Sequence, residues 1–278
     1  ILSYQEEEKM NSSKVISIIL KVSAFIVMLI LVAIIGYVMI LGIPQLKLSL
    51  FQWKYTSDNV SMLPSIINTI LMVVFSLLIA VPLGLGAAIF LTQYKREGKI
   101  VKLIRMTSET LSGIPSIVYG LFGNIFFATF CGFGYSLLSG ALTMSIMVLP
   151  LILRTSEEAL LAVPDALAEG SLALGAGKIR TISAVLLPSA MPGIISGVIL
   201  GMGRILGESA ALIYTAGTAA TMANGLLSQA RTLSVHMYAL TSEGLHMEEA
   251  RAVSAVLMVL VLIVNFISRK IGKKAGGK

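Results

Sequence analysis

The sequence predicts an all-α membrane protein with six transmembrane helices. Of its 278 residues, 56% are hydrophobic and only 13% are charged, whereas soluble globular domains carry about 25% charged residues. The charges gather in short stretches between apolar segments of about 18 residues or more, a length typical of transmembrane helices. This composition excludes a soluble enzyme and a disordered chain. It also excludes a disulfide-stapled secreted domain, because Cys131 is the single cysteine.

Six apolar segments can be assigned. They cover residues 22–41, 66–91, 111–130, 137–153, 186–214 and 252–267. The first has no small-residue cleavage pattern, so we expect a retained helix rather than a signal peptide. In the linker after it, Trp53 and Tyr55 are candidate anchors at the membrane interface. We expect three regions: residues 1–64, a compact membrane domain over 65–268, and a basic tail over 269–278.

The distribution of basic residues predicts the orientation in the cell membrane. If the segment before the first helix is cytoplasmic, 16 of the 21 lysines and arginines lie inside, 4 lie outside, and Arg204 lies within a span. This bias follows the positive-inside rule, so both ends of the chain are expected to be cytoplasmic. The net charge of +7 is then explained by the excess of lysine and arginine in the segments expected on the cytoplasmic side. We expect the basic tail to contact anionic membrane lipid and not nucleic acid.

Residues 154–185, between the fourth and fifth apolar segments, predict a cytoplasmic surface element. Residues 155–158, Thr-Ser-Glu-Glu, have the pattern of a helix start, and a second short helix is predicted to begin at residues 164–165, Pro-Asp. A Gly-rich turn around Gly175 follows. Short amphipathic helices joined in this way are suited to docking into a groove on a partner protein.

This segment resembles the cytoplasmic motif of ABC importer membrane subunits, which reads Glu-Ala-Ala, three residues, Gly, nine residues, Ile-x-Leu-Pro. Here Glu169 is followed at the same spacing by Gly175 and by residues 185–188, Val-Leu-Leu-Pro. The departures, two small residues for the alanines and valine for isoleucine, are conservative. The resemblance implies a coupling helix that sits in a cleft of an ATPase subunit. Its candidate residues are Glu169, Gly170, Ser171, Gly175, Lys178 and Arg180.

Arg204 and Glu208 are the only charges deep in a predicted span. A charge at mid-membrane costs at least ~2.5–3.5 kcal/mol on insertion scales, so such residues usually face a cavity or a partner. Their spacing of four residues would allow them to pair along one helix face. Gly193, Gly197 and Gly201 fall on the same arc of the helix, and glycines at this spacing permit close helix approach. We expect this face to meet the other half of a transporter or to line its path.

Longer strings resemble the PstA-type permeases of phosphate ABC importers. They are residues 149–159, 188–212 and 236–244, within a resemblance that runs from about residue 60 to 268. It implies a type I ABC importer permease fold with a cytoplasmic coupling helix. It further implies an integral membrane subunit that translocates inorganic phosphate together with a PstC-like permease, a PstB-like ATPase dimer and an external PstS-like phosphate-binding protein.

The candidate substrate-pathway residues are Arg204, Glu208 and, more weakly, Arg154 at the end of the fourth apolar segment. The planar guanidinium of arginine matches the oxygen geometry of phosphate. Three alternatives stay open. Arg204 would also suit molybdate or sulfate, and the charged pair could serve only to fix helix packing. An ion-gradient-driven secondary transporter would show broken helices in two matching halves, and the sequence has no internal repeat.

No catalytic, metal or cofactor site is predicted on this chain. Residues 175–178, Gly-Ala-Gly-Lys, lack the upstream Gly and the following Ser or Thr of a phosphate-binding loop. ATP and Mg²⁺ are therefore expected on a separate ATPase subunit. His236 and His246 have no neighbouring cluster with metal-ligand spacing, so both are expected to be exposed in an external loop.

Overall fold

The structure, a computed structural model, describes residues 2–94, 98–244 and 246–276. Within these ranges the regular elements are helices, and no strand is found. The longer helices are α1 (Leu2–Gly42), α2 (Leu63–Ile89), α3 (Lys99–Ser112), α5 (Leu137–Leu161), α8 (Leu187–Gly207), α10 (Leu233–Glu243) and α11 (Met247–Gly276). The shorter ones are α4 (Ser116–Gly123), α6 (Asp165–Ala173), α7 (Lys178–Thr181) and α9 (Ala210–Thr215). Residues 95–97 of the predicted basic loop and 277–278 of the predicted tail lie outside the described residues.

Five helical segments in the described part of the chain are long and apolar enough to cross a membrane, and a bent helix pair supplies a sixth candidate. The five segments are Ile16–Gln45, Leu63–Tyr94, Leu137–Leu161, Lys178–Gly207 and Met247–Lys270. The predicted all-α membrane fold with about six spans is therefore confirmed. The division of the chain at residues 64 and 268 stays a prediction.

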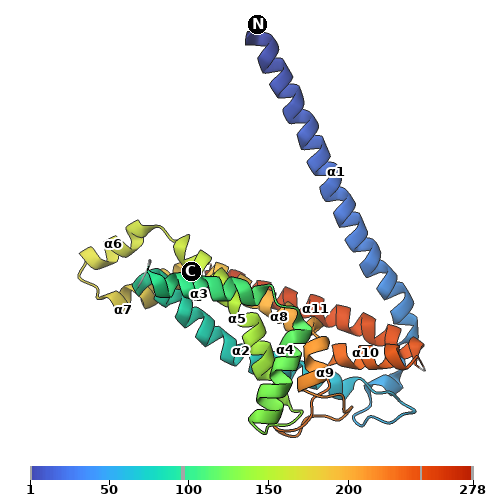
Figure 1. The fold of residues 1–278 in the computed structure, drawn as a ribbon. Coiled ribbons are helices and arrows are strands. Elements are labelled where there is room, and N and C mark those ends of the chain that lie inside the picture. The colour runs from blue at the N-terminus through green and yellow to red at the C-terminus, as the bar shows by residue number, and fades with distance from the viewer. Residues whose placement is uncertain (1, 95–97, 245, 277–278) are drawn as a thin grey trace.

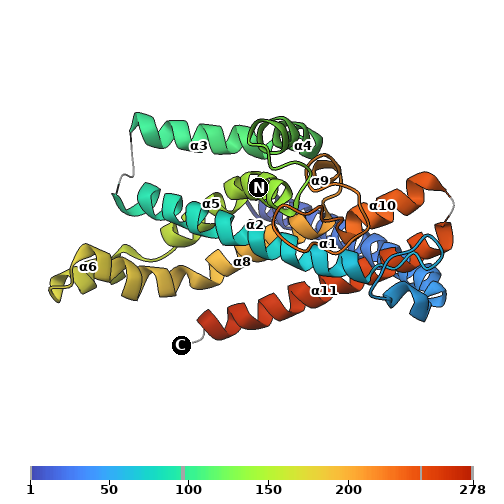
Figure 2. The same cartoon turned by 90° about the horizontal axis from the view of Figure 1, so that it is seen from below.

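The prediction of one continuous helical span over residues 111–130 is wrong, because the chain bends there by 104° between α3 and α4. Pro115 precedes α4 with extended backbone angles, φ −60° and ψ 142°. Proline has no N–H and restricts the residue before it, so a helix cannot pass straight through this point. α3 begins in the predicted basic loop and packs against α5, while α4 turns away from α3 (Figure 2).

The core of the bundle is formed by α2, α5, α8 and α11, with α5 packed between α2 and α8. Its fully buried side chains include Met72, Met144, Ile152, Ile205 and Leu206. A second cluster fastens the linker after α1 to α10 and α11 through Leu50, Met62, Leu233 and Val253. The ends of the bundle thus carry different elements, with α6 and α7 at one end and the linker and α10 at the other (Figures 1 and 2).

α1 projects away from the bundle (Figure 1). Its residues 18–34 are all exposed, whereas Gly42 at its C-terminal end packs closely on Arg251 and Ala255 of α11. The expectation that the first span stands apart from the others agrees with this arrangement.

Candidate coupling and translocation sites

α6, α7 and the turn between them form a hairpin that projects from one end of the bundle (Figure 1). The turn depends on Gly175, whose φ of +83° lies in the left-handed region that favours glycine. The Gly175 N–H donates to the Leu172 carbonyl at 2.9 Å. The hydroxyl oxygens of Ser171 on α6 and Thr181 on α7 lie 3.0 Å apart and hydrogen bond. The two short helices are therefore held together as one unit.

The outer surface of this hairpin is apolar and open. Its exposed apolar side chains are Leu167, Leu172, Leu174 and Ile179, of which Leu174 is 92% exposed. Glu169, Gly170, Lys178 and Arg180 are exposed beside them. An exposed apolar patch with a polar rim is typical of a protein interaction site. The Lys178 ammonium lies 4.4 Å from the centre of the Tyr94 ring, which links the hairpin to the end of the second span.

α5 continues without interruption through residues 155–158, so the helix start predicted there is wrong. The Thr155 hydroxyl donates back to the Leu151 carbonyl at 2.9 Å instead of capping a new helix. Glu157 is buried and accepts a hydrogen bond of 2.8 Å from Nε of Arg105 on α3. On the other side of the hairpin, α7 passes through the π-helical turn Ile182–Leu186 directly into α8. The hairpin is therefore connected to α5 and to α8 over very short stretches of chain.

α5 and α8 pack unusually closely where α8 carries glycine. A Cβ atom added to Gly197 would lie 2.7 Å from Cβ of Thr155, and one added to Gly193 would lie 2.6 Å from Cβ of Ala159. Such distances exclude any side chain unless the helices separate. At Gly201 the nearest side chain, Ile152, is at an ordinary 3.7 Å. This glycine face therefore meets α5 of the same chain, and the expectation that it meets the other half of a transporter is wrong at these positions.

The predicted pairing of Arg204 with Glu208 is also wrong. It assumed one helix over residues 186–214, but α8 ends at Gly207, and Glu208 has extended backbone angles of φ −77° and ψ 126°. The Glu208 carboxylate instead accepts a hydrogen bond of 3.1 Å from the N–H of Ala211 in α9. The Glu208 carbonyl accepts a second one of 2.6 Å from the hydroxyl of Ser234. Glu208 therefore stabilises the break between α8 and α9.

Arg204 is left half-buried in the last turn before this break, and its guanidinium has no hydrogen bond or ion pair to any described residue. It interacts electrostatically with Tyr119 of α4. The Tyr119 hydroxyl donates to the Leu111 carbonyl at 2.7 Å. A guanidinium has five N–H donors, so Arg204 retains its capacity to bind an anion at a point where the span is interrupted.

Arg154 lies at a different level of the bundle. Its Nε donates to Glu158 at 3.0 Å, and both side chains are exposed. The next residue, Thr155, packs on Gly197, about two helical turns before Arg204 along α8. The structure therefore does not bring the three predicted pathway residues together, since Arg154 and Glu208 each have their own partner.

A buried polar cluster at the opposite end of the bundle was missed by the sequence analysis. His236, expected to be exposed, is fully buried and contacts the guanidinium of Arg231. Burial and the charge of Arg231 lower the pKa of His236 to about 3, so the imidazole is neutral at physiological pH. Asn68 of α2 donates to the carbonyls of Thr221 (2.9 Å) and Arg231 (3.2 Å). An asparagine in an apolar span was the signal that could have revealed this cluster.

Among the described residues, no group of three or more His, Cys, Asp or Glu side chains is placed to hold a metal ion.

Residues 80–274 match the family model described as "Binding-protein-dependent transport system inner membrane component". The chain belongs to this family. It is therefore a multi-pass membrane component of a transport system.

Individual relatives agree with this assignment. The permease is 35% identical to the probable ABC transporter permease protein YqgI of Bacillus subtilis (strain 168), over 90% of this chain and 91% of that protein. It is 31% identical to the phosphate transport system permease protein PstA of Xylella fastidiosa (strain 9a5c), over 82% of this chain and 81% of that protein. The resemblance to PstA-type permeases is thereby confirmed.

A solved structure shows the same fold. A chain of the inward-facing MetNI methionine ABC transporter superposes on the permease with a TM-score of 0.60 and 20% identity, covering 86% of this chain and 97% of that chain. The expected type I ABC importer permease fold is confirmed by this likeness.

Proposed function

We propose that the permease translocates inorganic phosphate as a subunit of an ATP-driven importer. The observation that carries this proposal is Arg204, a half-buried arginine at a break in a membrane-spanning helix to which no carboxylate of the described residues is paired. Its planar fork of donors fits phosphate oxygens. Ionisable side chains inside a membrane bundle usually mark the route of an ion or substrate. The similarity to PstA over four fifths of both chains supports the same conclusion.

The proposed partners follow from two surfaces and from the family. The exposed apolar side of the α6–α7 hairpin fits a cleft on a PstB-like ATPase dimer, which would bind ATP and Mg²⁺. A PstC-like permease would complete the path, and an external PstS-like protein would deliver phosphate, in keeping with a binding-protein-dependent family. In this proposal the chain performs no chemical catalysis itself.

The connections of the hairpin to α5 and α8 suggest how a movement of the ATPase would be transmitted to the translocation path at Arg204. α7 leads directly into α8, and the close contacts at Gly193 and Gly197 make α5 and α8 move together. Arg204 sits at the far end of α8. Displacement of the hairpin would therefore shift Arg204 and open the path to one side at a time. Phosphate leaving toward the hairpin would meet Arg154 and compete with Glu158 for its guanidinium.

Transport by the complete complex tests this function. We expect vesicles that contain both permeases, the ATPase and the binding protein to accumulate radiolabelled phosphate only when ATP is present. Excess unlabelled phosphate should suppress the signal, and excess sulfate or molybdate should not. Preferred uptake of sulfate or molybdate would support the other oxyanions. Uptake that needs an ion gradient but no ATP would support a secondary transporter.

We also predict that the hairpin and both chain ends are cytoplasmic, because most basic residues lie on that side. In a Cys131→Ser background, a membrane-impermeant maleimide should label Gly225→Cys in intact cells. It should label Lys178→Cys only after permeabilisation. Both positions are exposed on this chain, so with the permease expressed without its ATPase the labelling reports sidedness and not burial. The reverse pattern would contradict both the orientation and the proposed ATPase contact.

A further inference from the structure

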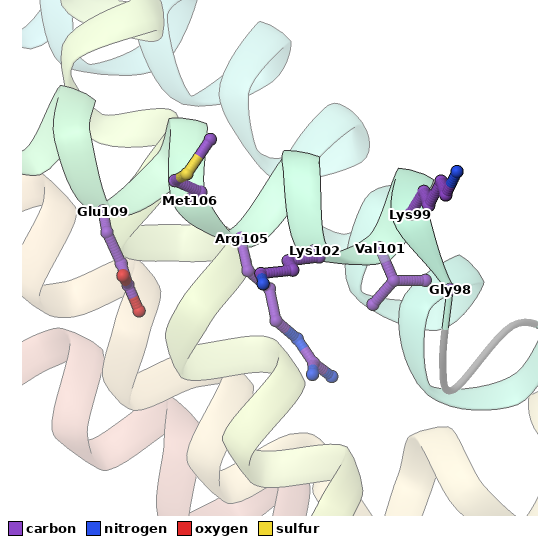
Figure 3. Close-up of a pocket in the computed structure, with 7 residues that line it drawn as sticks. All are labelled: Gly98, Lys99, Val101, Lys102, Arg105, Met106 and Glu109. Carbon is purple, nitrogen blue, oxygen red and sulfur yellow. The ribbon is translucent and has the colours of Figure 1, made fainter.

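α3 carries a row of basic residues along an open pocket of about 650 Å³ (Figure 3). The pocket is lined by Lys99, Lys102, Arg105, Met106 and Glu109, together with Gly98 and Val101. Figure 3 shows Arg105 and Glu109 directed to the same side of the helix, with Lys102 between Arg105 and the helix start. The proposed translocation path at Arg204 shares no residue with this pocket.

The three cationic side chains that line this pocket differ in whether a carboxylate is paired with them. Arg105 is fixed by its hydrogen bond to Glu157, which is buried on α5. Lys99 and Lys102 are exposed, and their ammonium groups have no hydrogen bond or ion pair with any described residue. Glu109 is the one carboxylate among the lining residues. The two lysines therefore provide uncompensated positive charge beside an arginine that is already held in place.

An exposed apolar strip runs along α3 next to these cations. Ile100, Leu103 and Met106 are 53%, 56% and 55% exposed. On the opposite side, Val101 is buried against Leu91 and Leu153. α3 thus has a face buried on the bundle, a cationic face and an exposed apolar face. A small inorganic anion would use only the cationic face, whereas an amphiphile with an anionic head would use both exposed faces.

The position of the pocket along the bundle suits a lipid headgroup. The second span ends at Tyr94, and α3 starts a few residues later at Lys99. Tyr94 contacts Lys178 of the hairpin, so the pocket lies at the end of the bundle that carries the hairpin, which we predict to be cytoplasmic. Phosphate groups of the bilayer lie at that level, and basic pockets beside transmembrane helices bind anionic headgroups.

We infer that this pocket binds an anionic phospholipid, with the phosphodiester held by Lys99 and Lys102 and an acyl chain lying along Ile100, Leu103 and Met106. Arg105, oriented by Glu157, lines the inner side of the same site. The inference does not depend on which anion the permease transports.

Native mass spectrometry of the purified complete complex tests this site, with phosphatidylglycerol or phosphatidylcholine added in detergent. We expect preferential binding of phosphatidylglycerol. The double variant Lys99→Gln/Lys102→Gln should weaken that binding by roughly fivefold for each lysine, as expected for a basic residue at an anionic surface. Leu103→Asn should weaken it as well, because the acyl chain loses an apolar contact. The double variant Lys47→Gln/Lys54→Gln removes the same charge from the opposite end and should leave the affinity unchanged.

Equal binding of the two lipids, or equal losses in the two lysine double variants, would overturn the inference. A separate titration distinguishes a lipid headgroup from free phosphate. Inorganic phosphate in large excess should not displace phosphatidylglycerol. Two results together would instead identify a site for a soluble anion. Inorganic phosphate would displace the lipid from the unmodified protein but not from Lys99→Gln/Lys102→Gln, and Leu103→Asn would bind lipid normally.

Discussion

Arg204→Gln should lower ATP-dependent phosphate uptake by ~100-fold or more while the complex still assembles. Hydrogen bonds to a charged group contribute about 1.5–3 kcal/mol each, and the substitution removes the bidentate contact that a guanidinium offers to phosphate. The guanidinium of Arg204 has no hydrogen bond or ion pair to another described residue, so its replacement breaks no such side-chain contact within the described chain. Uptake in vesicles and co-purification of the subunits would be measured side by side.

Three comparison variants sharpen this result. Arg204→Lys keeps the charge but loses the planar fork, so we expect intermediate uptake. Glu208→Gln retains an oxygen that can accept from Ala211 and should have a much smaller effect than Arg204→Gln. Arg251→Gln, at an exposed position on α11, should transport normally. Normal uptake by Arg204→Gln would refute the role in the path, and failed assembly of both Arg204 variants would assign the arginine to helix packing.

Gly175→Val should uncouple the permease from its ATPase and reduce uptake by ~10-fold or more. A β-branched residue strongly disfavours a positive φ, and strain of this kind costs about 1–3 kcal/mol. A Cβ atom at Gly175 would meet nothing within 4 Å, so the damage is confined to the turn and should spare membrane insertion. The measurements are co-purification of the ATPase and stimulation of ATP hydrolysis by phosphate-loaded binding protein.

Gly175→Asn is the matched control, because asparagine tolerates the left-handed conformation much better than valine. It should retain most of the ATPase association. Gly36→Val supplies a second control, since Gly36 also has no neighbour within 4 Å but does not have a positive φ. If Gly175→Val preserves both association and uptake, the hairpin is not the docking element.

The spans that the sequence predicted well are those in which the apolar run and the helix coincide. α2 and α5 contain the predicted segments 66–91 and 137–153 almost entirely, with α2 continued by a π-helical turn. Where the chain bends, hydropathy did not predict the end of the helix, because it reports how apolar a segment is and not the direction in which the chain runs. Pro115 was visible in the sequence as a point where α3 and α4 could separate. The break at Glu208 had a weaker local signal, the preceding Gly207. One of its stabilising contacts, to the distant Ser234, could not be foreseen from the local sequence.

The charged residues illustrate the same difference. Spacing alone suggested a partner for Arg204 four residues away, whereas the ion pairs that form near the hairpin include Arg105 with Glu157, 52 residues later. Such long-range partners depend on how α3 packs on α5. The coupling segment was predictable because its spacing and its left-handed glycine are properties of a short local stretch.

α1 is fastened to α11 near its C-terminal end, where Gly42 packs on Arg251 and Ala255. A helix that is held at one end does not have to bend when neighbouring helices rotate beside its exposed part. If α5 and α8 rock as proposed, we expect the exposed apolar part of α1 to keep its place in the bilayer. In the transport cycle proposed above, α1 would then act as a membrane anchor that is joined to the bundle through α11 at one end.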